Sequence, residues 1–143
     1  MNAAYPEHQL DTRPTSRRRL VGLAVVLAVA LNLVIYLVGR ACGGGFEFTQ
    51  GEQRAQVDAM TVAGFTAVPL IIGLITVALL ASRWRWVTPL ASVVAPSLAI
   101  LTIGVMTLPA DLDTISTISL AACHLTLAPI SVIAVRRLGR PFV

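Results

Sequence analysis

Residues 17–40 read RRRLVGLAVVLAVALNLVIYLVGR, and this stretch decides the fold. Three arginines precede a run from Leu20 to Gly39 that carries no charge. A helix needs roughly 20 apolar residues, at about 1.5 Å each, to cross about 30 Å of hydrocarbon. The stretch therefore predicts a membrane-spanning helix. Because a cleaved signal peptide has an apolar region of only about 7 to 15 residues, we expect this helix to be retained.

Three further stretches without charge follow along the chain. Hydrophobic residues make up 56% of the 143 residues and charged residues only 13%, a composition typical of an integral membrane protein. The sequence predicts an all-α, membrane-spanning four-helix bundle. We expect a disordered cytoplasmic tail at 1–18, a transmembrane domain at 19–137 and a cytoplasmic tail at 138–143. The expected spans are 20–39, 59–82, 86–108 and 114–135.

The charged residues gather outside the spans in five clusters whose sign alternates along the chain. Basic clusters stay on the cytoplasmic side during insertion, so the alternation predicts a multi-pass protein of the cell membrane with both termini in the cytoplasm. The basic clusters contain Arg13, Arg17, Arg18 and Arg19, then Arg83 and Arg85, then Arg136, Arg137 and Arg140. Between them lie Glu47, Glu52 and Asp58 with Arg54, and then Asp111 and Asp113.

The arginine excess gives a formal charge of +4, but it does not indicate nucleic-acid binding. Arginine near the ends of spanning helices orients the protein and contacts anionic lipid headgroups, and tryptophan is enriched at the same depth. We therefore expect membrane lipids as partners and no nucleic acid. The predicted headgroup anchors are Arg17, Arg18, Arg19, Arg83, Trp84, Arg85, Trp86, Arg136 and Arg137.

An unusual residue lies near the middle of each predicted span. Asn32, Pro69, Pro96 and His124 fall within about 3 Å of one plane when depth is counted at 1.5 Å per residue. Helical phase places small and polar residues on one stripe of the first span and one of the fourth, so both stripes should face inward. The stripes are Ala28, Asn32, Tyr36 and Gly39, and Thr117, Ala121, His124, Ala128 and Ser131. The candidate polar site is Asn32, Tyr36, Thr117, His124, Pro69 and Pro96.

Two interpretations of this layer stay open. Proline cannot donate a backbone hydrogen bond, so the carbonyls of Phe65 and Ser92 are released, and His124, Asn32 or a water molecule could satisfy one of them. A lone His or Asn in a bundle commonly makes one interhelical hydrogen bond, worth about 1 kcal/mol, that fixes packing. An ionisable group at the membrane centre is also a candidate for binding a ligand or moving a proton.

The connection at residues 40–58 is the longest between the spans. Its Gly43-Gly44-Gly45 run favours a flexible start, and we expect a disordered spacer, with a binding role as the alternative. In the third span, Ala91, Ala95 and Ala99 recur every four residues. This row either lets a neighbouring helix approach closely or simply reflects an alanine-rich span.

The inventory of reactive side chains argues against catalysis. No Asp or Glu lies in any span, and His124 is the only span histidine, so neither carboxylate-driven proton exchange nor a bis-histidine haem has its residues in one chain. Cys42 and Cys123 are about 15 Å apart along the membrane normal, which is beyond disulfide reach. We expect no enzyme activity, no cofactor and no metal.

Three short segments carry a resemblance to known sequences. Residues 30–36 read ALNLVIY, residues 69–73 read PLIIG, and residues 120–125 read LAACHL. With them the chain, from about Arg19 to Arg137, resembles a group of small four-helix bacterial membrane proteins labelled only as a domain of unknown function. The resemblance implies the four-helix fold and a place in a bacterial inner membrane. It implies no activity.

Two functions fit these features. The first is a non-enzymatic accessory or interaction component that associates with itself or with another membrane protein. The alternative is a small transporter or channel that uses the polar layer around His124 and Asn32. Such a pathway requires an oligomer, because four helices alone rarely enclose one.

Overall fold

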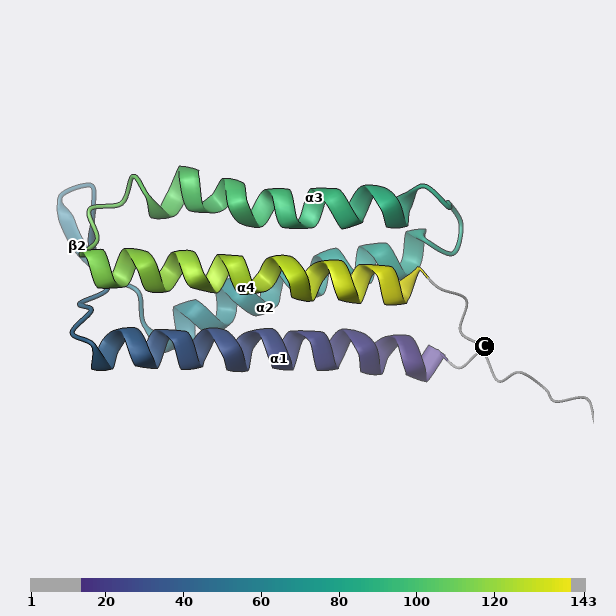
Figure 1. Ribbon diagram of the computed structural model, residues 1–143, viewed down its shortest axis with the longest axis horizontal. Helices are drawn as coiled ribbons and strands as arrows, with labels where there is room; N and C mark the ends of the chain where they lie inside the picture. Colours follow the sequence, from purple (N-terminus) through teal and green to yellow (C-terminus); the bar gives the residue numbers. More distant parts are fainter. Residues whose placement is uncertain (1–13, 140–143) are drawn as a thin grey trace, which may run out of the picture.

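The computed structural model describes residues 14–139, which form four long helices and one short β-hairpin (Figure 1). The predicted tails therefore lie mostly outside the described residues. In chain order the elements are α1 (Pro14–Ala41), β1 (Glu47–Gln50), β2 (Gln53–Gln56), α2 (Ala59–Leu80), α3 (Val87–Thr102) and α4 (Thr114–Leu138). A single π-helical turn, Ile103–Thr107, extends α3. All four helices are long and apolar enough to cross a membrane, as the sequence predicts.

The ends of the helices follow from local sequence. Pro14 begins α1 within the segment expected to be a tail, because proline suits the first helical position, where the missing N–H has no partner to lose. Asp58 precedes α2 and accepts a hydrogen bond from the Thr61 amide at 2.7 Å. Asp113 precedes α4 and accepts one from the Ser116 amide at 2.9 Å. Both carboxylates satisfy amides that the first helical turn leaves free.

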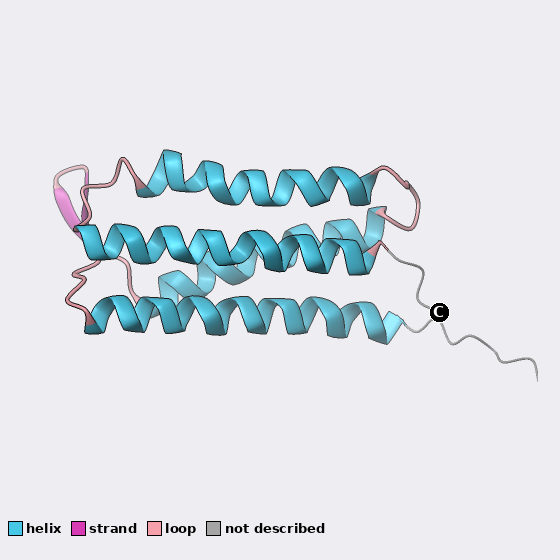
Figure 2. Ribbon diagram, viewed as in Figure 1, coloured by secondary structure: helices cyan, strands magenta, loops and turns pink. Residues whose placement is uncertain are grey.

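Helix α4 is the centre of the bundle (Figure 2). It packs against α1 on one side and α3 on the other, and α1 also packs against α2. Among residues 14–139, α1 and α3 do not contact each other, and α2 touches α3 and α4 much less than it touches α1. Helix α3 is consequently peripheral and buries the smallest share of its span. Ala91, Ala95 and Ala99 are half-buried, so this row is not a fully enclosed contact.

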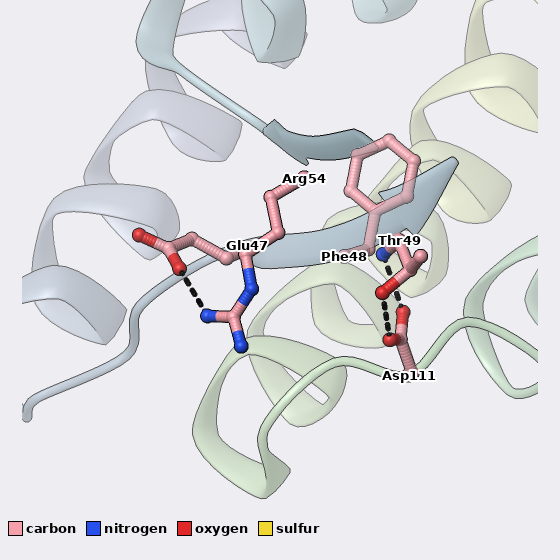
Figure 3. Close-up of a pocket in the computed structure, with 5 residues that line it drawn as sticks. All are labelled: Glu47, Phe48, Thr49, Arg54 and Asp111. Carbon is pink, nitrogen blue, oxygen red and sulfur yellow. Dashed lines mark hydrogen bonds and ion pairs between the residues drawn. The ribbon is translucent and has the colours of Figure 1, made fainter. Parts of the chain in front are cut away.

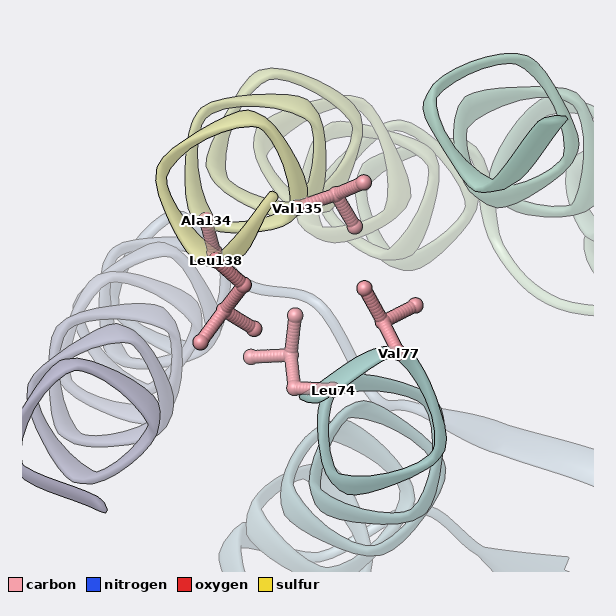
Figure 4. Close-up of a cluster of buried hydrophobic side chains, with 5 residues drawn as sticks. All are labelled: Leu74, Val77, Ala134, Val135 and Leu138. Carbon is pink, nitrogen blue, oxygen red and sulfur yellow. The ribbon is translucent and has the colours of Figure 1, made fainter. Parts of the chain in front are cut away.

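The main apolar core lies at the end of the bundle where α2 and α4 finish. Leu74 and Val77 from α2 meet Ala134, Val135 and Leu138 from α4 (Figure 4). Leu20, Val21 and Ala24 of α1 pack against the same cluster. Shape-matched packing of this kind is the main attraction available between helices in lipid, where no hydrophobic effect separates helix from solvent.

The expectation of a disordered spacer at residues 40–58 is wrong. Helix α1 ends in two backbone bonds, from Gly44 N to Gly39 O at 2.9 Å and from Gly43 N to Arg40 O at 3.1 Å, with Gly43 at φ +98°. This is the Schellman arrangement, in which glycine takes a left-handed backbone. Strands β1 and β2 then pair antiparallel with Glu47 opposite Gln56.

The apolar side chain of Phe46 fixes this connection in place. Phe46 has no exposed surface, and its ring centroid lies 4.7 Å from that of Tyr36. An aromatic ring in a segment rich in glycine and polar residues therefore anchors the hairpin to the bundle. We call residues 46–57 the outer hairpin, because they lie at one end of the bundle. The segment contains Phe46, both strands with their turn, and Val57.

Gly39→Ala tests the close approach of α1, α4 and the outer hairpin. An added Cβ at Gly39 would collide with the Ser119 side chain and stand 2.9 Å from a Phe46 ring carbon. We expect the substitution to lower stability by about 1 to 3 kcal/mol, measured by unfolding in detergent micelles. The control is Gly22→Ala in the same helix, where nothing lies within 4 Å, and a gain of about 0.5 to 1 kcal/mol is expected. Equal effects at the two glycines would contradict the packing described.

Candidate functional site

The Asn32 side chain is the polar centre of the bundle. It is 1% exposed, and it joins three helices. Its Nδ2 donates to Thr66 Oγ1 on α2 at 2.9 Å, and its Oδ1 lies 2.7 Å from Thr126 Oγ1 on α4. One amide therefore bonds α1 to both neighbouring helices.

Cys123 and Thr126 complete this cluster from α4. The Cys123 thiol donates to the backbone carbonyl of Asn32, with Sγ 3.6 Å from the oxygen. The Thr126 hydroxyl also lies 2.8 Å from the Cys123 carbonyl, so its single hydrogen is shared between two acceptors. Within residues 14–139, every buried side-chain nitrogen and oxygen has a hydrogen-bond partner. Each polar atom of the cluster therefore has at least one partner inside the bundle.

The predicted stripe on α1 faces inward, whereas the one on α4 does so only in part. Ala28, Asn32, Tyr36 and Gly39 are all buried. On α4 Ser131 is buried, but Thr117, Ala121, His124 and Ala128 are half-buried. The buried positions on the face of α4 that packs against α1 are Ser116, Ser119 and Cys123 instead.

The structure does not bring His124 to Asn32. Adjacent residues on a helix point about 100° apart, and Cys123 faces α1, so His124 is turned away from it. His124 lies about 60° of helical rotation from Gly139, where an added Cβ would collide with Thr88 of α3. His124 thus lies toward the α3 side of α4. It is half-buried and makes no hydrogen bond within the described part of the chain.

The two prolines share the depth of Asn32 but not its surroundings. Pro69 is exposed on the outward face of α2, where it lines a shallow apolar depression together with Gly64, Phe65 and Val68. Pro96 is half-buried in α3. Neither Asn32 nor His124 hydrogen-bonds a carbonyl that these prolines release. The Asn32 amide bonds two threonines, and His124 makes no hydrogen bond within residues 14–139. The four residues therefore lie at a similar depth but do not form one site.

Sequence reasoning missed the threonines that bind Asn32. Thr66 and Thr126 lie near its depth, which was the available signal. A threonine in a helix can also bond its own backbone, as Thr76 does to the Ile72 carbonyl, so the residue type alone does not indicate an interhelical bond. Pro129, inside α4, was missed as well.

The predicted headgroup anchors lie at the start of α1, in the α2–α3 connection and at the end of α4. These segments come together at the end of the bundle opposite the outer hairpin (Figure 1). Arg17 Nη1 donates to the carbonyl of Ala78 at 3.0 Å, in the last turns of α2. The Trp84 and Trp86 rings are stacked with centroids 6.2 Å apart. The other anchors, which are exposed, are Arg18, Arg19, Arg83, Arg85, Arg136 and Arg137. No Asp or Glu of residues 14–139 lies at this end.

Two carboxylates of the α3–α4 connection hold the outer hairpin and Gly45, the residue directly before it. Asp111 Oδ1 accepts from the Thr49 amide at 2.7 Å, and its Oδ2 accepts from the Thr49 hydroxyl. Asp113 Oδ2 accepts from the Gly45 amide at 3.0 Å and from the Ser116 hydroxyl. Ser116 Oγ in turn accepts from the Phe46 amide at 2.8 Å. These contacts join the α1–α2 connection to the α3–α4 connection.

The same bonds favour ionised carboxylates. Hydrogen bonds from the Ser116 side chain and amide lower the pKa of Asp113 from 3.8 to about 2. The Thr49 side chain and amide lower the pKa of Asp111. Both shifts arise because donors stabilise the charged form. The two aspartates are therefore acceptors at neutral pH and are poor candidates for proton transfer.

A small recess beside Asp111 contains two charged groups of the outer hairpin, those of Glu47 and Arg54 (Figure 3). It has a volume of about 110 Å³ and is lined by Glu47, Phe48, Thr49, Arg54 and Asp111. Arg54 pairs with Glu47 at 3.4 Å, while Asp111 bonds Thr49. The polar groups thus pair with one another. Within residues 14–139, no three His, Cys, Asp or Glu side chains come together to hold a metal ion.

Comparison with protein families gives one match. Residues 12–141 match the model of a family described as a family of unknown function (DUF6069). Comparisons with curated proteins and with solved structures give no match.

A double-mutant cycle tests the Asn32 cluster. Thr126→Val removes one partner of the amide, so Asn32→Ala and Thr126→Val should be coupled by about 0.6 to 1.7 kcal/mol in the free energy of unfolding in micelles. The matched cycle of Asn32→Ala with His124→Ala should be additive within about 0.5 kcal/mol, because those side chains share no contact. Stronger coupling to His124 than to Thr126 would overturn the geometry above.

The lowered pKa of Asp113 predicts how its hydrogen bond with the Gly45 amide responds to acid. A lowered folded-state pKa means that the contribution of Asp113 to stability is complete above its ordinary value of 3.8 and is lost as the pH falls through about 2. The Gly45 amide resonance, followed by NMR in micelles, should hold its shift from neutral pH to pH 4 and move toward pH 2. Asp113→Asn should abolish this transition. A midpoint near 3.8 in the unmodified chain would contradict the hydrogen bonding.

Proposed function

The chain belongs to the DUF6069 family of unknown function, and on this premise we propose that it is a non-enzymatic accessory or interaction component of a cell membrane. In this proposal it crosses the bacterial inner membrane four times, and both termini lie in the cytoplasm. Its partners are membrane lipids and either a second copy or another membrane protein.

The buried cluster at Asn32 carries this proposal. Asn32 is 1% exposed and Cys123 5%, and both polar atoms of the amide are already bonded, Nδ2 to Thr66 and Oδ1 to Thr126. A site that binds and releases a ligand needs polar groups that are free to exchange partners. This cluster instead resembles the interhelical hydrogen bonds that fix packing in membrane bundles.

The charge distribution supports the proposed orientation and lipid partners. Seven arginines lie at the end formed by the start of α1, the α2–α3 connection and the end of α4. All five described carboxylates lie at the opposite end, near the outer hairpin. Basic residues are held on the cytoplasmic side and attract anionic headgroups, while tryptophans such as Trp84 and Trp86 prefer the interface. No nucleic acid is needed to account for the arginines.

The peripheral position of α3 supports an interaction role. Its span is almost wholly unburied within the chain, and large apolar side chains such as Val93, Leu98 and Leu101 point outward. Such a helix is free to contact lipid or a helix of a partner.

No carboxylate lies within the four spans, which supports the absence of an enzyme activity.

One observation favours the alternative of an oligomeric transporter or channel. His124 lies at mid-span, is half-buried and has no hydrogen-bond partner within residues 14–139. An ionisable side chain at this depth without a partner suits a pathway formed between copies. In that case water would reach the α3 side of α4, beside Cys123.

Labelling of the two cysteines distinguishes these functions. Cys42 is exposed near the outer hairpin and Cys123 is buried, and neither forms a disulfide. In intact cells, a membrane-impermeant maleimide should label Cys42 and leave Cys123 unmodified, as read by mass spectrometry. Cys42→Ser is the control that identifies the labelled position. Labelling of Cys123 in native membranes would contradict the closed interior, and labelling of Cys42 only after permeabilisation would contradict the orientation.

A further inference from the structure

We propose that the outer hairpin is a latched lid that covers the end of the α1–α4 interface and moves as one unit. In this lid Phe46 is the plug, and Asp111 with Asp113 and Ser116 is the latch. The proposal goes beyond the accessory role above, because it assigns to the hairpin control of access from this end of the bundle.

The plug fills the mouth of the interface between α1 and α4. Phe46 is fully buried and packs against Tyr36 and Val62. Beneath its ring, Gly39 and Ser119 approach so closely that a Cβ on the glycine would meet both Phe46 and Ser119. Removal of the ring would therefore open a path from the end of the bundle to the Ser119 side chain.

The latch is separate from the internal bonds of the hairpin. Within residues 14–139, the outer hairpin and Gly45, which precedes it, hydrogen-bond only three side chains on the α3–α4 side, those of Asp111, Asp113 and Ser116. The β-ladder, the bond from Val57 N to Phe46 O at 2.8 Å and the Glu47–Arg54 pair all lie inside the hairpin. The bonds that hold the two strands together therefore do not depend on Asp111, Asp113 or Ser116.

The docked position is also strained at the plug. Phe46 has φ +54°, a left-handed backbone that a bulky side chain rarely adopts. Such conformations persist only when surrounding contacts hold them, and they are common at switch regions. Here the Ser116 hydroxyl holds the Phe46 amide and the buried ring holds the side chain. Loss of these contacts releases the strain, which favours undocking.

The test uses the full chain in lipid nanodiscs, where both ends are open to water. A reporter thiol is placed under the plug by Ser119→Cys in a Cys42→Ser, Cys123→Ser background, and its rate of reaction with a sulfonated maleimide is measured. The latch variant is Asp111→Asn with Asp113→Asn. At position 113, asparagine keeps an oxygen for capping α4 but sets an NH₂ group against the Gly45 amide. At position 111, it removes the negative charge to which the Thr49 amide and hydroxyl donate. The matched control is Asp58→Asn, which caps α2 at the same end and bonds only Thr61.

We expect the latch variant to label about tenfold faster or more, since it weakens hydrogen bonds to two charged acceptors. The control should stay within about twofold of the unmodified chain. Phe46→Ala, which removes the plug and leaves both caps intact, should label as fast as the latch variant.

Two results would overturn the lid. One is an unchanged rate in both the latch variant and Phe46→Ala. The other is an equal acceleration by Asp58→Asn, which would indicate general loosening of helix ends. A failure of the proposed accessory role can be told apart from a failure of the lid. The accessory role is tested by labelling of Cys123 in the native sequence, and Cys123 lies one helical turn deeper than the reporter at position 119.

Discussion

The rest of the structure depends on one constraint, which is that a polar side chain in the hydrocarbon layer must find its partners inside the protein. Asn32 meets it by bonding Thr66 on α2 and Thr126 on α4. Because these bonds run in two directions from one amide, they fix the rotation of three helices at once. Apolar packing alone permits many rotations with similar energy, since lipid and leucine are equally apolar.

The rotation of α4 that this amide requires determines what lies on its other faces. With Cys123 and Ser119 directed to α1, the buried positions nearest the other end, Ala134 and Leu138, reach the α2 side chains Leu74 and Val77. His124 is then left on the α3 side. The Asn32 cluster, the apolar core and the position of His124 are three consequences of one helix orientation, and α3, which contributes nothing to the cluster, remains peripheral.

The outer hairpin shows how a polar connection becomes ordered at the end of a membrane bundle. Its segment carries glycine, charge and little apolar surface, which is why sequence composition favoured disorder. One aromatic ring and three acceptors on the α3–α4 side reverse that outcome. Neither Asp111 nor Asp113 reveals this role in the sequence, because a carboxylate between two spans reads equally well as a simple topological marker or as the cap of the next helix.

The sequence by itself determined the number of helices and, within a few residues, most of their ends, because span length and the exclusion of charge from hydrocarbon are local properties. The exception is the start of α1, at Pro14 inside the segment expected to be a disordered tail. The depth of each residue and the inward stripe of α1 also followed from the sequence. Only the tertiary structure decided which residues at one depth meet. Asn32 and His124 lie at similar depth yet face different helices, because a contact depends on how the helices rotate about their axes, and that rotation is set by partners far apart in the sequence.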